Sequence, residues 1–148
     1  MSEFMDMALE EAHGAATRGE VPVGAVVVGP GRSILARSGN RIVELRDPTA
    51  HAEILAIRAA AEALGSERLT DCDLYVTLEP CPMCAGAISL ARIRRLYYGA
   101  EDEKAGGVDH GPRIFSHPTC HHAPEVYGGI RGEKAAEILK AFFRERRQ

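Results

Sequence analysis

Residues 73–91 read DLYVTLEPCPMCAGAISLA, and this stretch sets the kind of fold that the chain can adopt. Asp73 to Leu78 is short and apolar, as buried strands are, whereas Ala85 to Ala91 is typical of a helix. The junction between them carries two cysteines, Cys81 and Cys84. A strand that enters a helix through a cysteine pair predicts an α/β fold with chemistry at the junction.

The segments on either side of this stretch continue the alternation of helix and strand. Towards the N-terminus the pattern predicts a first helix that ends at Gly19 and carries on one face Met5, Ala8, Leu9, Ala12 and Ala16. A buried strand from Val21 to Val28 follows, then a turn at 29–31 and a return strand from Ser33 to Ser38. The next predicted helix runs from Ala50 to Leu64, with Thr49 as N-cap and a stop at Gly65. Towards the C-terminus the pattern predicts a strand from Arg95 to Tyr98, a loop over 103–124, a short strand from Glu125 to Tyr127 and a last helix from Glu133 to Arg146. This order predicts a mostly parallel or mixed sheet with helices on both faces, in one domain that spans residues 1–148.

Length and composition restrict the class of protein. The chain has 148 residues, of which 45% are hydrophobic and 26% charged, as expected of one globular domain. No apolar run reaches the roughly 20 residues that a membrane-spanning helix needs, and the acidic start lacks the features of a signal peptide. We therefore expect a cytoplasmic protein without a membrane partner. In a reducing compartment, four cysteines favour metal or catalytic roles over disulfides.

The charge is unevenly distributed along the chain. The net charge of -3 gives no overall sign of nucleic-acid binding. From Arg131 to the C-terminus, however, six basic residues face three acidic ones, and such a local excess can bind phosphates. The alternative is a solvated helix with cations at its C-terminal end, where the helix dipole favours them.

The pair Cys81-x-x-Cys84 can hold one metal ion. Both thiols lie at the start of a predicted helix, whose N-terminus favours the deprotonated form that binds metal. By itself the pair is equally consistent with a redox dithiol or with half of a four-ligand structural zinc site.

A second motif, His51-Ala52-Glu53, begins another predicted helix. Residues two apart on a regular helix point to nearly opposite sides, so the imidazole and the carboxylate converge only over the open N-terminal end. Thr49 as N-cap would place them there. Taken alone, the two side chains are also consistent with surface or capping positions.

Together the two motifs supply three zinc ligands, His51, Cys81 and Cys84, and one carboxylate. Three protein ligands leave a tetrahedral zinc with one open position, where water bound to the ion becomes a nucleophile near neutral pH. Glu53 is then expected to move protons rather than bind the metal. A competing model closes the site with a fourth ligand from His117, Cys120, His121 or His122. Cys72 and Cys120 are otherwise expected to be packed thiols.

H-x-E followed by P-C-x-x-C is a signature of zinc-dependent nucleobase deaminases. The chain resembles the cytidine-deaminase-like superfamily and, within it, the bacterial tRNA-specific adenosine deaminases. The matching blocks are EVPVGAV (20–26), NR (40–41), DPTAHAE (47–53), LYVTLEPC (74–81), MCAGA (83–87), ARI (91–93), YGA (98–100), and FFR with RR (142–147). The zinc motif points to the superfamily, whereas EVPVGAV, DPTAHAE and the C-terminal block point to the tRNA enzymes.

The resemblance implies a three-layer α/β/α fold with a mixed five-stranded sheet, and a homodimer with one Zn²⁺ per subunit. It also implies hydrolysis of adenosine to inosine at the wobble position of a tRNA anticodon, in most bacteria that of an arginine tRNA. An enzyme of this kind would splay the bases of the anticodon stem-loop into pockets.

The resemblance carries further residue roles. His51, Cys81 and Cys84 would bind zinc and Glu53 would shuttle protons, whereas Asn40 and the backbone of Ala52 would contact the target nucleotide. The expected contacts to the rest of the RNA are His122, Phe143, Arg144 and Arg147. The chain departs from the family in the loop 105–110, which lacks the usual Gly-Ser, and at His121-His122, where the family has Asn-His.

Two other functions stay open. One is a deaminase of a free base or nucleoside, such as cytosine or guanine, on the same fold; the basic C-terminal block favours RNA over this. The other is an RNA-binding module with a structural zinc and no catalysis. Glu53 argues against it, because a closed site has no use for a carboxylate beside the metal.

Overall fold

The computed structural model describes residues 2–146. Its elements in chain order are α1 (Ser2–Thr17), β1 (Gly24–Gly29), β2 (Ser33–Gly39), α2 (Ile42–Leu45), α3 (Ala52–Leu64), β3 (Asp73–Leu78), α4 (Pro82–Ala91), β4 (Arg95–Ala100), β5 (Glu125–Tyr127) and α5 (Gly132–Arg146). Single 3₁₀ turns lie at Pro30–Arg32 and Ile114–Ser116.

The five strands form one mixed sheet in the order β2-β1-β3-β4-β5. β1 runs antiparallel to both β2 and β3, whereas β3, β4 and β5 are parallel to one another. The predicted hairpin and the predicted mixed five-stranded sheet are therefore confirmed.

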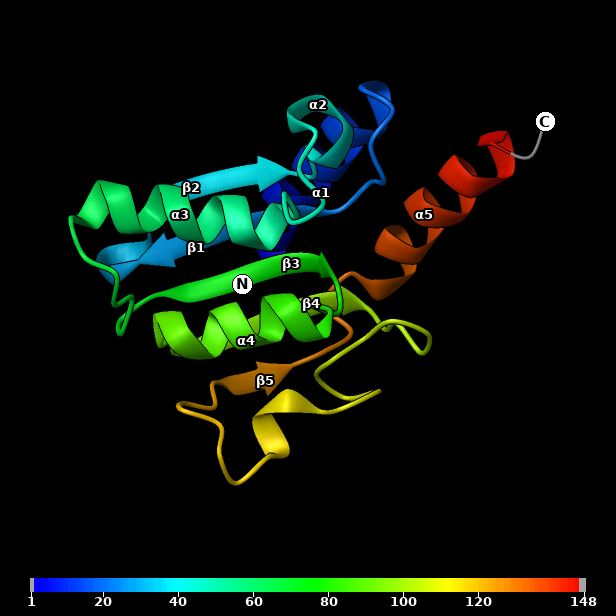
Figure 1. Ribbon diagram of the computed structural model, residues 1–148. Coiled ribbons are helices and arrows are strands. Elements are labelled where there is room, and N and C mark those ends of the chain that lie inside the picture. The colour runs from blue at the N-terminus through cyan, green and yellow to red at the C-terminus, as the bar shows by residue number, and fades with distance from the viewer. Residues whose placement is uncertain (1, 147–148) are drawn as a thin grey trace.

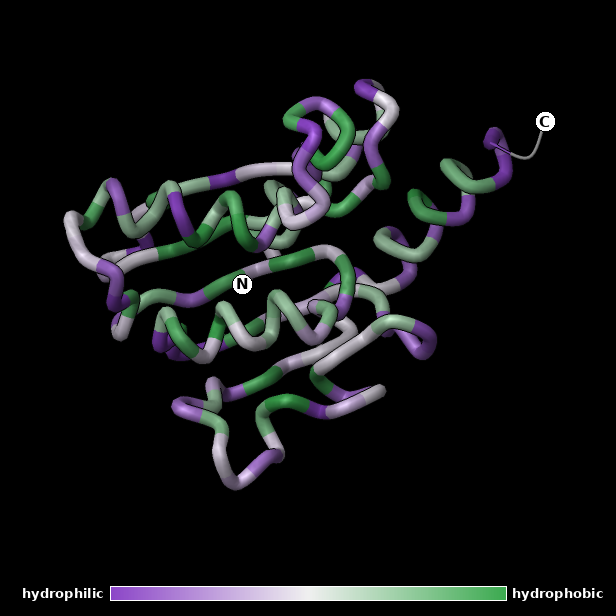
Figure 2. Tube along the Cα trace, viewed as in Figure 1, coloured by the Kyte–Doolittle hydropathy of each residue, from purple (hydrophilic) through white to green (hydrophobic). Residues whose placement is uncertain are grey.

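Helices cover both faces of the sheet, which gives the three layers that were expected (Figure 1). On one face, alanines of α3 and residues of α4 such as Ile88 pack against Val27, Leu74 and Leu96. On the other face, Phe4 and Met5 of α1 pack against alternate residues of the same strands. Both faces are apolar, so the central strands are hydrophobic along most of their length (Figure 2).

The helix α1 lies unusually close to β1. A β-carbon placed on Gly24 would lie 1.9 Å from the carbonyl oxygen of Ala8, so only glycine fits between the helix and the strand. Met5, Ala8 and Ala12 are fully buried in this contact. The predicted apolar face of the first helix is confirmed at these positions, although Ala15 is buried more deeply than Ala16.

The predicted start of the second long helix is wrong. α3 begins at Ala52, with His51 as its N-cap, and not at Ala50 behind Thr49. The N–H and hydroxyl of Thr49 both donate to Asp47 Oδ1, at 2.9 and 2.7 Å, which holds Thr49 in a turn before the helix. The cap comes instead from Asn40, whose Oδ1 accepts the Ala52 N–H at 2.7 Å.

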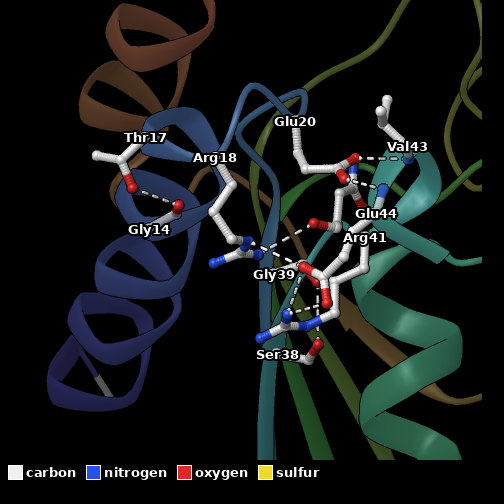
Figure 3. Close-up of polar contacts among 10 residues, drawn as sticks. Gly14, Thr17, Arg18, Glu20, Ser38, Gly39, Arg41, Val43 and Glu44 are labelled. Atoms are coloured by element: carbon white, nitrogen blue, oxygen red, sulfur yellow. Dashed lines mark hydrogen bonds and ion pairs between the residues drawn. The ribbon is translucent and has the colours of Figure 1, made fainter.

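A short helix, α2, lies in the polar stretch 39–48 for which no helix was predicted. The side chain of Glu20 provides its start: Oε1 accepts the Val43 N–H at 3.1 Å, and Oε2 accepts the Glu44 N–H at 2.8 Å. Figure 3 shows Glu20 pointing at these two backbone groups. Because the cap lies more than twenty residues upstream, local sequence gave no sign of this helix.

Other boundaries differ by a few residues. β1 starts at Gly24 rather than Val21, because the Val23 N–H donates back to the Val21 carbonyl at 2.9 Å in a tight turn. α4 starts at Pro82, since proline is well suited to the first turn of a helix. β4 continues to Ala100, and the loop after it contains one 3₁₀ turn.

Among residues 2–146, no helix combines the length and the apolar composition required to cross a bilayer.

Candidate metal centre and active site

The N-terminal ends of α3 and α4 meet beside the C-terminal end of β3. His51 is the N-cap of α3 and Cys81 is the N-cap of α4, each in an extended backbone conformation. β3 ends at Leu78, three residues before Cys81. Pro82 begins α4 and places Cys84 in its first turn, so both sulfurs and the imidazole lie over open helix ends.

The three predicted ligands converge. The Nδ1 atom of His51 lies 3.7 Å from Cys81 Sγ and 3.5 Å from Cys84 Sγ, and the three donor atoms all lie within 4.8 Å of one another. A tetrahedral zinc with ordinary Zn–S and Zn–N bonds holds such a sulfur and nitrogen about 3.5 Å apart. The donor set and its spacing therefore fit a zinc ion.

The electrostatics of the three ligands favour a thiolate. A hydrogen bond from Cys84 and then one from His51 lower the pKa of the Cys81 thiol to about 4, against the effect of burial. The same contact raises the pKa of Cys84, which acts as the donor of the pair. The hydrogen bond with Cys81 also raises the pKa of His51. The contacts around Cys81 thus favour its thiolate form, the form in which a cysteine binds metal.

Glu53 lies next to these ligands without being one of the group of three donor atoms. It is the second residue of α3, its side chain is buried, and it lines the same pocket as His51 and Cys81. Burial raises the pKa of its carboxyl group to about 7, and its own backbone N–H and the charge of His51 oppose the rise. A carboxyl group with a pKa near neutrality can both accept and donate a proton.

The pocket in front of the metal centre has a volume of about 230 Å³. It is lined by Val21, Val23, Asn40, Ile42, His51, Glu53, Leu78, Glu79, Cys81, Asp102 and Ala105. The exposed surface of the walls is mostly apolar, and the carboxylate of Glu53 and the amide of Asn40 are among the polar groups that line it. Such a lining suits a flat, partly polar ligand of the size of a nucleobase.

Asn40 is one of the pocket residues, as the predicted role of contacting the nucleotide requires. Its side chain is 5% exposed and is already held on two sides. Besides accepting from Ala52, it donates through Nδ2 to the Val21 carbonyl at 3.2 Å. The Ala52 N–H is occupied by this contact, so the structure gives Asn40 a second task, the capping of α3.

His122 lies at the other end of α4, away from the pocket. Its Nε2 is 2.8 Å from the Ile93 carbonyl, and its N–H donates to Ser89 Oγ at 3.0 Å. Cys120 contacts the same serine, at 3.4 Å. Within residues 2–146, none of the four proposed fourth ligands joins the group formed by His51, Cys81 and Cys84.

The C-terminal helix α5 leans away from the sheet over its second half (Figure 1). Phe143 is 45% exposed and, with Arg144, lines a separate depression that also includes Leu139 and Lys140. Arg146 stacks on Phe142 and donates to the Gly19 carbonyl at 3.0 Å, which ties the helix end to the loop after α1. Arg147 lies outside the described residues.

Glu79 was not singled out from the sequence, yet its carboxylate is fully buried beside the pocket. Its partners lie 23 to 31 residues further along the chain, so no local pattern indicated them. Burial raises the pKa of this group, but hydrogen bonds from Asp102, His110 and neighbouring backbone groups prevail and hold the pKa below its usual value.

The chain is similar in sequence to known deaminases. A family model described as MafB19-like deaminase matches residues 1–147. A tRNA-specific adenosine deaminase of Agrobacterium fabrum is 64% identical over 146 residues, which cover 99% of this chain and 95% of that protein.

Two solved structures bear on the fold and the pocket. One, from a study of A-to-I editing by tRNA:A34 deaminases at the wobble position, superposes with a TM-score of 0.92 at 64% identity and covers 94% of this chain and 100% of the other. The guanine deaminase of Bacillus subtilis superposes with a TM-score of 0.63 at 44% identity, over 67% of this chain and 63% of its own.

Proposed function

The chain belongs to the family of tRNA-specific adenosine deaminases, and from this premise we propose that it hydrolyses adenosine to inosine at the wobble position of a tRNA anticodon. The observation that carries the proposal is the 64% identity to the Agrobacterium fabrum enzyme over 99% of the chain. The reaction breaks the bond between C6 of adenine and its amino group, forms a bond from C6 to the oxygen of water, and releases ammonia. It takes place in a single domain that spans residues 1–148.

We propose that His51, Cys81 and Cys84 hold one zinc ion. The arrangement of their donor atoms supports this, since the two sulfur–nitrogen distances match those of a tetrahedral zinc site. The chemistry that zinc supplies when bound is activation of water for attack at neutral pH.

Glu53 would carry the protons of the reaction. Its buried carboxylate would take one proton from the attacking water and pass it to a ring nitrogen of adenine. It would then take the second proton from the hydroxyl now bonded to C6 and give it to the amino group, which leaves as ammonia. The pKa of about 7 suits both directions of transfer. Asn40, with one amide hydrogen left after its contacts to Val21 and Ala52, would orient the base. The backbone N–H of Ala52 would contact the base in place of its present acceptor, Asn40 Oδ1.

The anticodon stem-loop would lie across the mouth of the pocket and reach α5. Phe143 offers an exposed ring for stacking, and Arg144 and Arg147 offer positive charge for phosphates. We propose that His122 contacts a part of the RNA away from the target base, because this residue lies at the end of α4 that is far from the pocket. An arginine tRNA is the proposed substrate and the cytoplasm the proposed location.

We also propose that the protein is a homodimer. Met83 and Leu90 are exposed on the outer face of α4, at 38% and 65%, while the opposite face of this helix is buried in the core. Two large apolar side chains on one helix face are a reason to expect a covering partner, and a second copy is the simplest one.

A deaminase of a free base is the second candidate. The likeness to the Bacillus subtilis guanine deaminase favours it, as does a pocket of nucleobase size. The exposed Phe143 and the basic residues around it favour RNA, since a free base has no use for them.

The test is to incubate the zinc-loaded protein with an anticodon stem-loop that carries adenosine at the wobble position, and separately with free adenosine, guanine and cytosine. We expect inosine in the RNA and no turnover of the free compounds. Turnover of a free base alone would overturn the proposal in favour of the second candidate. Bound zinc without any turnover would instead favour a structural metal site.

A further inference from the structure

The carboxylate of Glu79 joins two segments that build the metal pocket. Glu79 follows β3 directly and lies two residues before the ligand Cys81. Its side chain has no exposed surface. Such a group needs hydrogen-bond donors around both oxygens, because burial of an unpaired charge is strongly unfavourable.

Five donors surround this carboxylate, and all come from residues 102–110. Oε1 accepts the Asp102 N–H at 3.1 Å and lies 2.7 Å from the His110 Nδ1. Oε2 accepts the backbone N–H groups of Val108, Asp109 and His110 at 3.2, 3.0 and 3.1 Å. One side chain thus fixes both ends of the loop 102–110.

The loop that Glu79 fixes is also a wall of the pocket. Asp102 and Ala105 line the pocket together with His51, Glu53 and Cys81. The Asp102 side chain in turn accepts the N–H groups of Lys104 and Ala105, at 3.2 and 2.9 Å, so the bend of the loop starts from the residue that Glu79 holds.

Two glycines let the loop lie directly on the ligand-bearing segment. A β-carbon on Gly106 would lie 2.4 Å from Glu79 Oε2, and one on Gly107 would lie 2.6 Å from the Pro82 nitrogen. The Gly107 N–H donates to the Pro80 carbonyl at 2.8 Å. The segment 79–82 and the loop 102–110 therefore form one packed unit.

We propose that Glu79 is a positioning residue: it holds the loop 102–110 as a wall of the pocket and thereby sets how tightly the pocket binds the target base. The identity of that base rests on the proposed function, whereas the anchoring of the loop does not. Glu79 does not itself transfer a proton or bind the metal, since both of its oxygens are occupied by the loop.

The substitution Glu79→Gln tests this with little change in shape. Glutamine has one acceptor oxygen where glutamate has two, so it leaves one end of the loop without its acceptor. Backbone hydrogen exchange at Asp102 and at Val108 to His110 should accelerate about tenfold or more, since exchange reports local opening. KM for the stem-loop should rise about tenfold while kcat changes less than threefold, because a displaced wall weakens binding. Zinc content should stay at the wild-type value.

Glu62→Gln is the matched control. Glu62 is exposed on α3, and the same change of one atom there leaves the pocket untouched. If Glu79→Gln does not fold, His110→Ala takes its place, because it removes one of the five donors and leaves the carboxylate. We then expect faster exchange at residues 108–110 and a rise in KM of about threefold.

Wild-type exchange in the loop, or a wild-type KM, in the folded Glu79→Gln protein would overturn the proposal. A loss confined to kcat would also overturn it, since it would assign Glu79 to the chemical step. If His110→Ala is the variant measured, unchanged exchange and KM count against the proposal in the same way. Should the wild-type protein not deaminate the stem-loop at all, the proposed function fails. Loop exchange and the Kd for the stem-loop then still test Glu79 separately.

Discussion

His51 Nδ1 and Cys84 Sγ lie 3.5 Å apart although 33 residues separate them in the chain. The contact exists because α3 and α4 both begin at the same end of the sheet, one after the hairpin and the other after β3. A metal bound between them would link these two helix starts.

Cys84→Ser should lose zinc. A hydroxyl is a much weaker zinc ligand than a thiolate, and two remaining ligands do not hold the ion firmly. Metal analysis of the purified variant should show far less than one zinc per chain, and deamination should fall to background. Cys120→Ser is the control. Cys120 lies outside the ligand group, so this variant protein should keep its zinc. Full zinc content in Cys84→Ser would show that this sulfur is not a ligand.

Glu53→Gln should keep zinc and lose activity. The amide fills the same buried space but cannot accept a proton, so kcat should fall by about 10²- to 10⁴-fold. Metal content and kcat, measured on the same preparation, separate the two roles. A loss of zinc in parallel with activity would mean that Glu53 is a ligand, contrary to its assignment here.

The double substitution Phe143→Ala and Arg144→Ala should weaken RNA binding without affecting the metal. Loss of one base–aromatic stack costs about 1–3 kcal/mol, which corresponds to a rise in Kd of about 5- to 150-fold. The dependence of Kd on salt should also become less steep, because one phosphate contact is gone. Arg68→Ala removes one exposed positive charge elsewhere and should bind RNA like the wild type. An unchanged Kd for the double variant would remove α5 from the RNA-binding surface.

The pair of His110 and Glu79 should make stability depend on pH. The hydrogen bond to Glu79 raises the pKa of His110 above its usual 6.5. The protonated imidazole therefore stabilises the folded state fully below pH 6.5, and this contribution is lost as the pH rises through the raised pKa.

Urea unfolding between about pH 6 and about pH 9 measures this contribution as the difference between wild type and His110→Ala. We expect the difference to shrink as the pH rises. In a Glu79→Gln background the same replacement should give a difference that varies less with pH, because the main partner charge is absent while Glu101 and Glu103 remain. A difference that grows with pH in the wild-type background would contradict the pairing.

Gly24→Ala should destabilise the fold. Its new methyl group would meet the Ala8 carbonyl at 1.9 Å, so α1 must move away from β1. Overpacking of this kind costs about 1–3 kcal/mol, and thermal unfolding should show a lower Tm. Gly14→Ala is the control: the nearest atom to its methyl group is an arginine nitrogen at 3.5 Å, and alanine in a helix interior should raise stability by about 1 kcal/mol. An unchanged Tm in Gly24→Ala would show that α1 adapts at little cost.

The sheet, the main helices and the three side chains that converge in the candidate metal centre could be predicted from the sequence alone. Strands such as 73–78 are visible as short apolar runs, and helices as apolar positions repeated every three or four residues. The three candidate ligands are visible because metal chemistry restricts both the residue types and their spacing, as at Cys81 and Cys84. These signals lie within one element or at its start.

The contacts that hold the helix starts and the pocket walls became visible only in the folded chain. Asn40 caps α3, Glu20 starts α2, and Glu79 fixes the loop 102–110, each across 12 to 31 residues of chain. The prediction of Thr49 as N-cap was wrong for this reason, since a nearer residue fitted the local pattern while a distant side chain made the bond. A hydrogen bond between distant residues depends on how the elements pack, and a single sequence carries no periodic signal of it.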